Sequence, residues 1–414
     1  MNHDTEQAKL VVFDDGRGRF GPLTQVWPAF AIRSGALRGA TRIANALQRR
    51  VCGGLVPETH VAIAREAYAG TPINQLVELG AVLAVNGRWS GMDRTIVEAI
   101  ENLRPGDALT TPQGDLLAAF TTGETLEQRG VQQLSAEHAS WGGEQRVCEA
   151  ELFARPWDVL NTLDERITAD IARLGLPVAA DLPHGVTRVG GHAIHAHHEA
   201  TVSPHVHLDT TLGPIAIDQG AIAHPFTVIE GPCYLGPQAV VAANTTLRAG
   251  CAIGKGCKVG GELKAAILDD FSNKAHFGYL GNALVGRWCN LGAGTTASNL
   301  KNTWGEVRMQ LEPGDDPEPT GRAFLGPVLG DFVRTAIGTT LPTGAVIGAA
   351  ACLVASSFAP KHVPALTFLA DDGPQATDLS ALQRTLERMM QRRGQTPTDA
   401  LMQRLGVLSE ANGG

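Results

Sequence analysis

The sequence predicts two structural parts: an α/β domain of about 175 residues, followed by a triangular parallel β-helix with a C-terminal helix. Three observations predict this arrangement. Strand-like and helix-like segments alternate in the first part of the chain, an apolar residue then recurs every six positions, and the 414 residues include 48 glycines although only 5% are aromatic. Alternating strands and helices are typical of parallel-rich α/β domains, and a short fixed period is typical of a solenoid.

The α/β domain begins with the apolar run Lys9–Phe13, which predicts a strand. A turn rich in glycine and arginine follows, of the kind that comes after the first strand of a nucleotide-binding sheet. Its residues are Asp14, Asp15, Gly16, Arg17, Gly18 and Arg19.

Downstream, the apolar pattern predicts a helix over Arg38–Arg50 and a buried strand over Gly80–Val85, which ends at Asn86 and Gly87. An amphipathic helix is expected over Asp158–Leu174. A proline-rich segment follows that helix, and we therefore assign residues 1–178 to the α/β domain.

The six-residue period is uninterrupted over eight apolar positions, which are Ile217, Ala223, Ile229, Leu235, Val241, Leu247, Ile253 and Val259. A small residue stands two places before most of these apolar positions, and three of these small residues are cysteines. Each hexad supplies one short strand and one turn, so three hexads make a triangular coil with the aliphatic residue pointing inward. The same step resumes at Leu329, and we assign residues 179–358 to the β-helix.

Helical spacing returns near the end of the chain, where Leu382, Leu386 and Met389 lie within the segment 380–394. A stacked coil has exposed edges at its ends and needs a cap. We expect this helix to lie on or beside the last coil, and we assign residues 359–414 to a helical extension.

The composition excludes several classes of protein. With 34 Lys and Arg against 42 Asp and Glu, the net charge is -8, which argues against nucleic-acid binding because such proteins carry a basic surface. No apolar run reaches about 18 residues, and the first residues are polar, so we expect no membrane span, no secretory signal and a cytoplasmic protein. The seven cysteines form no CxxC pair and indicate reduced thiols.

Seven histidines crowd the start of the β-helix: His184, His192, His195, His197, His198, His205 and His207. Alternating histidines could place imidazoles on one face of neighbouring strands, as a metal site needs. No carboxylate or cysteine stands beside them at ligand spacing, which favours ordinary surface positions over a metal site. Both interpretations remain open at this point.

The segments 272–281, 290–295 and 298–302 resemble the GlmU family, in which an N-acetylglucosamine-1-phosphate uridylyltransferase is joined to a glucosamine-1-phosphate acetyltransferase. The N-terminal Phe13-Asp14-Asp15 and Pro22-Leu23-Thr24 resemble a shorter bacterial branch of GlmU-like sugar nucleotidyltransferases. The resemblance implies a nucleotidyltransferase-like α/β domain and a left-handed parallel β-helix that forms a homotrimer.

The same resemblance implies the candidate site residues. His276 matches the catalytic base, Tyr279 a sugar-contacting tyrosine and Lys264 a phosphate-binding lysine, while Arg248, Asn290 and Asn299 match further pocket residues. These types suit acetyl transfer to an amine, which needs a base near pH 7 and fixed positive charge for a sugar phosphate. Acetyl-CoA is the implied donor.

Two departures from the family bear on the substrates. Gly305 stands where the family has a lysine, and Lys301 is the nearest cation. Arg88 stands where the fold usually carries a metal-binding aspartate, and an arginine cannot bind magnesium. Either Mg²⁺ is held elsewhere, with Asp14 or Asp15 as candidate ligands, or the first domain binds a nucleoside triphosphate without turning it over.

The loop from Glu312 to Gly321 interrupts the coils. It is either a plain surface excursion or a wall of the acyl-donor groove that reaches a neighbouring subunit. Two functions remain open as well. The chain either acetylates an amino-sugar 1-phosphate beside a nucleotidyltransferase domain, or acts only as a nucleotidyltransferase whose β-helix is a trimerisation and regulatory scaffold.

Overall fold

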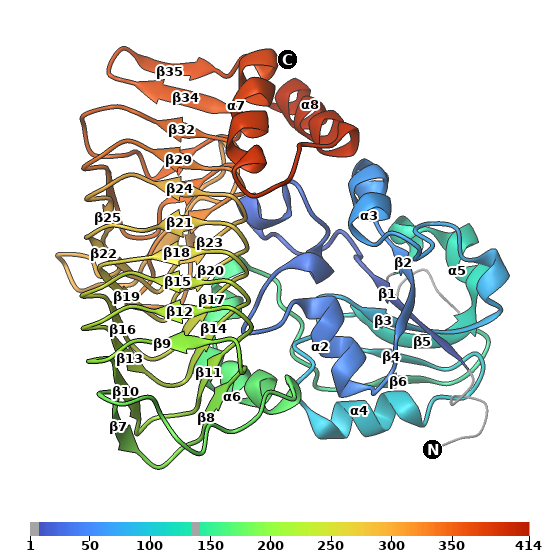
Figure 1. Ribbon diagram of the computed structural model, residues 1–414. Coiled ribbons are helices and arrows are strands. Elements are labelled where there is room, and N and C mark those ends of the chain that lie inside the picture. Colours follow the sequence, from blue (N-terminus) through green and yellow to red (C-terminus); the bar gives the residue numbers. More distant parts are fainter. Residues whose placement is uncertain (1–7, 135–140, 414) are drawn as a thin grey trace.

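The computed structural model describes residues 8–134 and 141–413, which form an α/β unit beside a tall β-solenoid (Figure 1). The α/β unit has a six-stranded mixed sheet of order β2-β1-β3-β5-β4-β6. Strand β1 runs parallel to β2 and β3, whereas β5 is antiparallel to β3 and β4. The strands are β1 (Lys9–Phe13), β2 (Val51–Leu55), β3 (Ala81–Asn86), β4 (Ala108–Thr110), β5 (Leu116–Thr122) and β6 (Gln145–Val147).

The helices of this unit are α2 (Gly39–Ala46), α3 (Val61–Ala67), α4 (Arg94–Glu101), α5 (Gly123–Arg129) and α6 (Leu163–Arg173). Short 3-10 turns are η1 (Gly21–Thr24), η2 (Ala29–Ala31), η3 (Glu58–His60), η4 (Val77–Leu79), η5 (Val131–Gln133) and η7 (Pro156–Leu160). Two helix predictions were too long. Gln48 and Thr162 each adopt a positive φ, which ends α2 early and separates η7 from α6.

The solenoid is a left-handed parallel β-helix with three ladders of short strands. The first is β7 (Thr187–Gly190), β10 (His207–Thr210), β13 (Val228–Glu230), β16 (Thr246–Leu247), β19 (Glu262–Lys264) and β22 (Tyr279–Gly281). The second is β8 (Ile194–Ala196), β11 (Ile215–Ile217), β14 (Cys233–Leu235), β17 (Cys251–Ile253), β20 (Ile267–Leu268), β23 (Leu284–Val285), β28 (Val328–Leu329), β31 (Val346–Ile347) and β33 (His362–Val363).

The third ladder is β9 (Thr201–Val202), β12 (Ile222–Ala223), β15 (Val240–Val241), β18 (Lys258–Val259), β21 (Asn273–Lys274), β24 (Asn290–Leu291), β29 (Arg334–Thr335), β32 (Cys352–Leu353), β34 (Thr367–Ala370) and β35 (Gly373–Ala376). Two further pairs are β25 (Thr296–Ala297) with β30 (Thr340–Leu341), and β26 (Arg308–Met309) with β27 (Glu318–Pro319).

The predicted period is confirmed by the strand register. Cys233 pairs with Cys251, eighteen residues later, and all eight apolar repeat positions from Ile217 to Val259 are fully buried. Beyond Val259 the period breaks, because Ile253 pairs with Leu268 after only fifteen residues and Val285 pairs with Leu329 across an excursion. The candidate catalytic residues lie in this irregular stretch.

Four of the cysteines are part of the solenoid core. All seven are free thiols, and Cys233, Cys251, Cys257 and Cys289 are fully buried in the solenoid. Burial raises the pKa of the Cys251 thiol to about 12, so this side chain packs as a small apolar group.

The C-terminal helix α7 (Leu379–Gln391) lies beside the upper coils (Figure 1). Leu382 and Leu386 are buried as predicted, but the third buried residue is Met390, whereas Met389 is half-buried. The antiparallel hairpin β34–β35 ends the third ladder, so it and not α7 covers the last coil. A helix that the sequence did not predict, α8 (Asp399–Gly413), packs against α3 of the α/β unit.

Charged side chains join the α/β unit to the solenoid. Arg38 donates to both carboxylates of Asp269 and Asp270 at 2.7 Å, and Arg33 donates to the same pair at 3.0 and 2.8 Å. Arg287 completes this cluster at 3.4 Å from Asp269. The arginines hold the pKa of the Asp269 carboxyl well below its usual range.

Within the described ranges, no helix combines the length and apolar character that a membrane crossing requires.

Candidate active site on the solenoid

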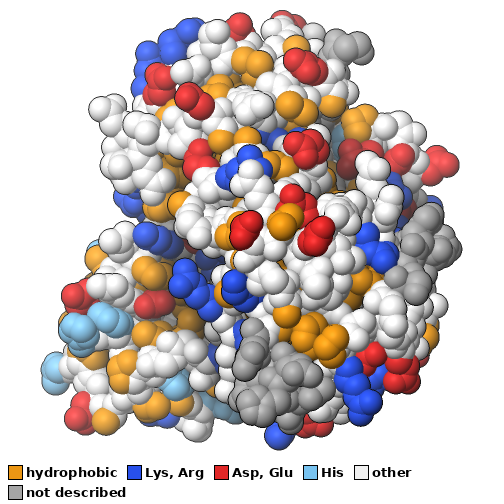
Figure 2. All heavy atoms as spheres, turned by 90° about the vertical axis from the view of Figure 1, so that its right-hand side faces the viewer, with side chains coloured by type: hydrophobic (Ala, Val, Ile, Leu, Met, Phe, Trp, Pro, Cys, Tyr) orange, Lys and Arg blue, Asp and Glu red, His pale blue; other side chains and the backbone are white. Residues whose placement is uncertain are grey.

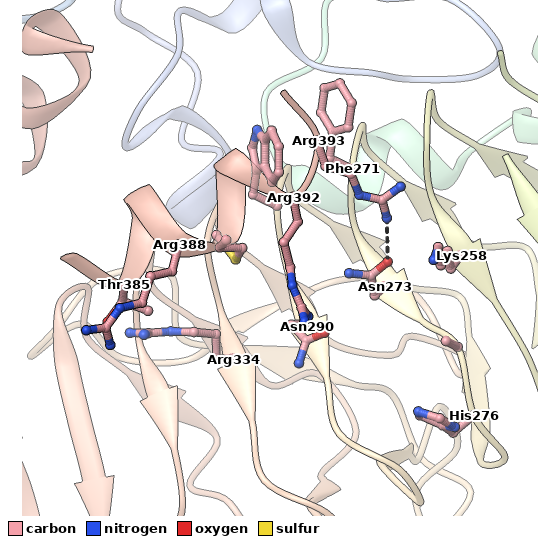
Figure 3. A pocket seen from close by; sticks show the side chains of 13 residues that line it. Lys258, Phe271, Asn273, His276, Asn290, Arg334, Thr385, Arg388, Arg392 and Arg393 are labelled. Atoms are coloured by element: carbon pink, nitrogen blue, oxygen red, sulfur yellow. Dashed lines mark hydrogen bonds between the residues drawn. The ribbon is translucent and has the colours of Figure 1, made fainter. Parts of the chain in front are cut away.

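A cavity of about 1060 Å³ lies between α7 and the third ladder of the solenoid (Figure 3). Strands β18, β21, β24 and β29 form one wall, and α7 forms the other. The lining residues are Lys258, Phe271, Asn273, Ala275, His276, Trp288, Asn290, Arg334, Thr385, Arg388, Met389, Arg392 and Arg393.

The charge of the cavity wall is one-sided. Five lining residues are cations, namely Lys258, Arg334, Arg388, Arg392 and Arg393, and no lining residue is acidic. In the part of the chain that the structure describes, none of the five makes an ion pair, and the buried Arg334 Nε has no hydrogen-bond partner. Unpaired cations around one cavity favour a ligand with several negative charges.

The cavity wall also offers an aromatic surface. The rings of Phe271 and Trp288 stack with their centroids 4.4 Å apart. Arg393 donates to Asn273 Oδ1 at 3.3 Å, which ties α7 to β21 (Figure 3). A ligand that carries both phosphates and a planar ring matches this combination of groups.

His276 lies at one end of the cavity, in the turn between β21 and β22, and its imidazole is exposed (Figure 3). The turn is held from inside the coil by Lys274, whose buried ammonium donates to the carbonyl oxygens of His276, Phe277 and Gly260 at 2.5, 3.0 and 3.2 Å. Burial lowers the pKa of Lys274 to about 8.

Gly278 allows this turn to close. Its φ is +117°, and a Cβ there would lie 2.2 Å from the carbonyl oxygen of Thr295. Only glycine meets both conditions. The backbone that carries His276 is therefore fixed by a glycine after it and a buried lysine before it.

A second group of predicted residues lies on or beside the first ladder, whose strand β22 begins directly after this turn. The amide of Asn299 donates to Tyr279 Oη at 3.0 Å and to Asn282 Oδ1 at 2.8 Å. Burial, with the nearby Glu262 carboxylate, raises the pKa of Tyr279. The Arg248 guanidinium lies 3.4 Å from Glu262, which pairs with Tyr279 in the ladder.

Lys264 lies on the same ladder, opposite Gly281, and its side chain is exposed. The predicted residues thus divide into two sets. His276 and Asn290 lie in the cavity, whereas Arg248, Lys264, Tyr279 and Asn299 gather on the neighbouring ladder. The turn of His276 joins the two sets. At the position of the missing family lysine, Lys301 Nζ donates to the Glu306 carbonyl at 2.9 Å.

Sequence reasoning missed Lys274, Arg334 and the arginines of α7. A signal for Lys274 existed, because it pairs with Val259 of the preceding coil, at an inward-facing position where the repeat otherwise places an aliphatic residue. Arg388 and Arg392 are four residues apart on a helix and therefore share one face.

The carboxylates of the N-terminal turn are already hydrogen-bonded within the α/β unit. The amides of Gly16 and Ala29 donate to the two oxygens of Asp14 at 2.9 and 2.7 Å. Arg88 is buried and donates to both oxygens of Asp15, at 2.9 and 2.6 Å. Asn86 donates to the same carboxylate at 2.8 Å, and Gly87 stands beside it with its amide bonded to Phe13.

Asp115 completes this cluster, with one oxygen 2.9 Å from Arg17 and the other 2.9 Å from Arg88. Every carboxylate oxygen of Asp14, Asp15 and Asp115 therefore already faces a donor. As arranged, these carboxylates do not fit a magnesium ion, because backbone amides occupy the oxygens of Asp14 and guanidinium groups occupy those of Asp15 and Asp115.

The excursion containing Glu312 to Gly321 packs on the α/β unit of its own chain. Its strands β26 and β27 form a hairpin whose Met309 and Leu311 are buried in one cluster with Phe20. Ion pairs join Arg19 of the N-terminal turn to Asp315 and Glu318 of the hairpin. Burial of these apolar side chains explains why the excursion docks here.

The histidines around the first coils lie at the surface or are half-buried, and Figure 2 shows histidine side chains gathered at the end of the molecule where these coils lie. His205 stacks on Phe226 with parallel rings, and His195 bonds to the Leu176 carbonyl at 3.0 Å. Among the described residues, no three His, Cys, Asp or Glu side chains come together as a metal site would require.

Known proteins are similar to separate parts of this chain. Residues 10–176 match the family model described as sugar nucleotidyl transferase. The bifunctional protein GlmU of Jannaschia sp. is 29% identical over 208 residues, which cover 45% of this chain and 43% of that protein. The GlmU of Gloeobacter violaceus is 36% identical over 121 residues, or 27% of this chain and 26% of that protein.

The GlmU of Nitratidesulfovibrio vulgaris is 38% identical over 96 residues, which cover 23% of this chain and 21% of that protein. The chain thus spans less than half the length of these curated relatives. These matches confirm the resemblance to GlmU that the sequence motifs indicate. Among solved structures, PerB from Caulobacter crescentus in complex with CoA and GDP-perosamine aligns over 90% of this chain and 98% of that chain, at 12% identity. Its TM-score of 0.14 is too low to carry an argument.

Proposed function

We propose that this GlmU-like chain is an enzyme of sugar-nucleotide biosynthesis. It transfers an acetyl group from acetyl-CoA to the amine of an amino-sugar 1-phosphate. The observation that carries the proposal is the position of His276, between a cavity lined by five unpaired cations and a polar cluster on the next ladder. We divide the chain into residues 1–178 for a nucleotidyltransferase-like domain, 179–358 for the acyltransferase β-helix, and 359–414 for a helical extension.

In this proposal the cavity takes the donor. Acetyl-CoA carries phosphates and an adenine ring, which suit the unpaired arginines and the stacked pair of Phe271 and Trp288. The acceptor sugar phosphate takes the other side of the turn, where Arg248 and Lys264 supply positive charge and Tyr279 and Asn299 supply hydrogen bonds. Asn290 lines the cavity and can bind either substrate from that side.

The chemistry then follows from the base between them. The acceptor nitrogen attacks the thioester carbonyl carbon, a C–N bond forms, and the His276 imidazole takes the proton that the amine loses. The C–S bond breaks, and the imidazolium returns a proton to the leaving thiolate. Backbone amides of the glycine-rich turns are candidates to stabilise the oxyanion.

A second activity is supported by the match of residues 10–176 to the sugar nucleotidyl transferase model. We propose that this domain binds a nucleoside triphosphate and a sugar 1-phosphate, as a UDP-N-acetylglucosamine diphosphorylase-like unit, through Asp14 to Arg19, Asn86 and Gly87. Mg²⁺ would be needed for turnover of the usual kind, and the paired carboxylates do not favour its binding. The alternative function is nucleotidyl transfer alone, with the β-helix as scaffold.

A homotrimer belongs to the same proposal. Triangular coils present flat faces that pack around a threefold axis. Phe226, Phe277 and Ile337 each follow a strand of the third ladder, on three separate coils, and are 60%, 72% and 81% exposed, which supports burial of that corner by other copies. Light scattering on the purified full chain would give the mass of three chains.

Two assays on one sample test the proposal. The first follows thiol release from acetyl-CoA with glucosamine 1-phosphate, and the second follows pyrophosphate release from UTP with N-acetylglucosamine 1-phosphate, with and without Mg²⁺. His276→Ala should abolish thiol release and leave pyrophosphate release unchanged. His224→Ala is the matched control, because His224 follows the strand β12 on the same ladder three coils earlier. Pyrophosphate without thiol release from the unchanged protein would favour the scaffold alternative.

A further inference from the structure

The hairpin of the solenoid excursion brings carboxylates onto two arginines of the α/β unit. Glu318 accepts from Arg19 through Oε1 at 2.5 Å and from Arg155 through Oε2 at 2.7 Å. Asp315 pairs with Arg19 as well. One carboxylate therefore bridges two guanidinium groups that come from separate segments, the N-terminal turn and the start of η7.

The other cations of the N-terminal turn already have partners within the α/β unit. Arg17 pairs with Asp115, and the buried Arg88 pairs with Asp15 and Asp115. The carboxylates found on Arg19 and Arg155, in contrast, both come from the hairpin. The side chains of Arg19 and Arg155 remain 43% and 28% exposed, so a ligand in solution can reach them.

Two guanidinium groups that share one carboxylate can equally share one phosphoryl group, because the planar donors match the oxygens of either anion. The hairpin stem is fixed by apolar burial at Met309 and Leu311, whereas its tip is held by partly exposed ion pairs. Such ion pairs hold weakly and compete poorly with a multiply charged anion. The tip can therefore leave while the stem stays docked.

We propose that Arg19 and Arg155 form a binding site for the phosphoryl groups of a nucleoside triphosphate or of free pyrophosphate, and that Glu318 and Asp315 occupy this site until such a ligand displaces them. The inference rests on the nucleotide binding proposed above for Asp14 to Arg19, and it adds Arg155 and a hairpin that occupies the site. It makes the solenoid hairpin a competitor of the ligand at the N-terminal turn, so that the ligand and the docked tip exclude each other.

Binding of UTP and of inorganic pyrophosphate to the full chain, measured by calorimetry without metal, tests the proposal. The double variant Glu318→Gln with Asp315→Asn removes the competing charges, and we expect both affinities to rise about fivefold. Asp316→Asn is the matched control, because Asp316 is the exposed neighbour of Asp315 in the same hairpin and should leave both affinities unchanged. The double variant Arg19→Ala with Arg155→Ala should lose binding.

Hydrogen exchange supplies a second readout. Saturating UTP or pyrophosphate should speed exchange of the amides of residues 312, 314–316 and 318 in the unchanged protein. The Glu318→Gln, Asp315→Asn variant should show fast exchange without ligand. Binding of both ligands supports a site for phosphoryl groups in general. Binding of UTP alone supports a site whose phosphoryl groups come from a nucleotide. Equal affinities in the variant and the unchanged protein, binding that survives loss of both arginines, or no binding of either ligand would each overturn the inference. Thiol release at His276 is independent of all these outcomes.

Discussion

Replacing Lys274 by methionine removes an ammonium and keeps an unbranched apolar side chain, and we expect it to slow acetyl transfer far more than it destabilises the fold. The Nζ atom donates to three carbonyl oxygens, two of them in the turn of His276. Hydrogen bonds from charged donors contribute about 1.5 kcal/mol or more each. Burial lowers the pKa of Lys274 to about 8, which corresponds to a cost of about 3 kcal/mol for keeping the charge.

These contributions oppose each other, so the free energy of unfolding should fall by only about 1–2 kcal/mol. The turn, however, loses the donor that fixes two of its carbonyls, and a displacement of the base by about 1 Å lowers a rate by roughly 100-fold. The KM for acetyl-CoA should change little, because the cations of the cavity are untouched.

Thiol release gives kcat and KM for the Lys274→Met variant, and urea unfolding gives its stability. Lys255→Met is the matched control, since Lys255 is exposed on the preceding coil. A variant that keeps its kcat would refute the positioning role, even if its stability fell. A variant that loses more than about 4 kcal/mol of stability would also refute the reasoning, because the two contributions would then not balance.

Three further predictions concern buried groups. Burial raises the pKa of Asp331 to about 6. Between pH 3.8 and 6 the folded protein therefore binds more protons than the unfolded chain, and it loses stability as the pH rises through that range. In urea unfolding, Asp331→Asn should be more stable than the unchanged protein by up to about 3 kcal/mol at pH 7, with no difference below pH 4. Burial, together with Arg404, lowers the pKa of His60 to about 4. Here the unfolded chain binds the extra proton, so about 3 kcal/mol is lost as the pH falls from 6.5 to 4, and His60→Gln should flatten this dependence in unfolding curves at the two pH values. Arg42 and Asp170 form a fully buried ion pair at 2.8 Å. Arg42→Met leaves an unpaired carboxylate and should lower the free energy of unfolding by about 3–5 kcal/mol, measured by thermal unfolding. The double variant with Asp170→Leu should recover most of this lost stability.

The solenoid could be predicted from the sequence because its period is local. An inward-facing side chain every six residues repeats the same environment, and the buried positions from Ile217 to Val259 follow it without exception. The helix α8 could not be predicted in this way, because its buried residues Leu401 and Leu405 pack against Val26 and Ile63 from the start of the chain. Such long-range contacts leave no period in the sequence.

The candidate site was predictable only in part for the same reason. His276 and Asn290 lie within one motif of neighbouring coils, and both reach the cavity. The opposite wall comes from α7, about a hundred residues later, and nothing near the motif indicates that Arg388 and Arg392 would face it. At the N-terminal turn, the sequence indicated a nucleotide-binding turn, but it could not indicate that Asp315 and Glu318 of the solenoid hairpin pair with Arg19.

The charged cluster between the two units has a thermodynamic consequence for how they can communicate. Parting the units would leave Arg33 and Arg38 without counter-ions on one side and the adjacent Asp269 and Asp270 without theirs on the other. Loss of a partner from a buried ion pair costs several kcal/mol. A hinge motion that opens the interface between the α/β unit and the solenoid is therefore energetically unfavourable. The proposed release of the hairpin tip would therefore leave the frame that carries both candidate sites with a constant geometry.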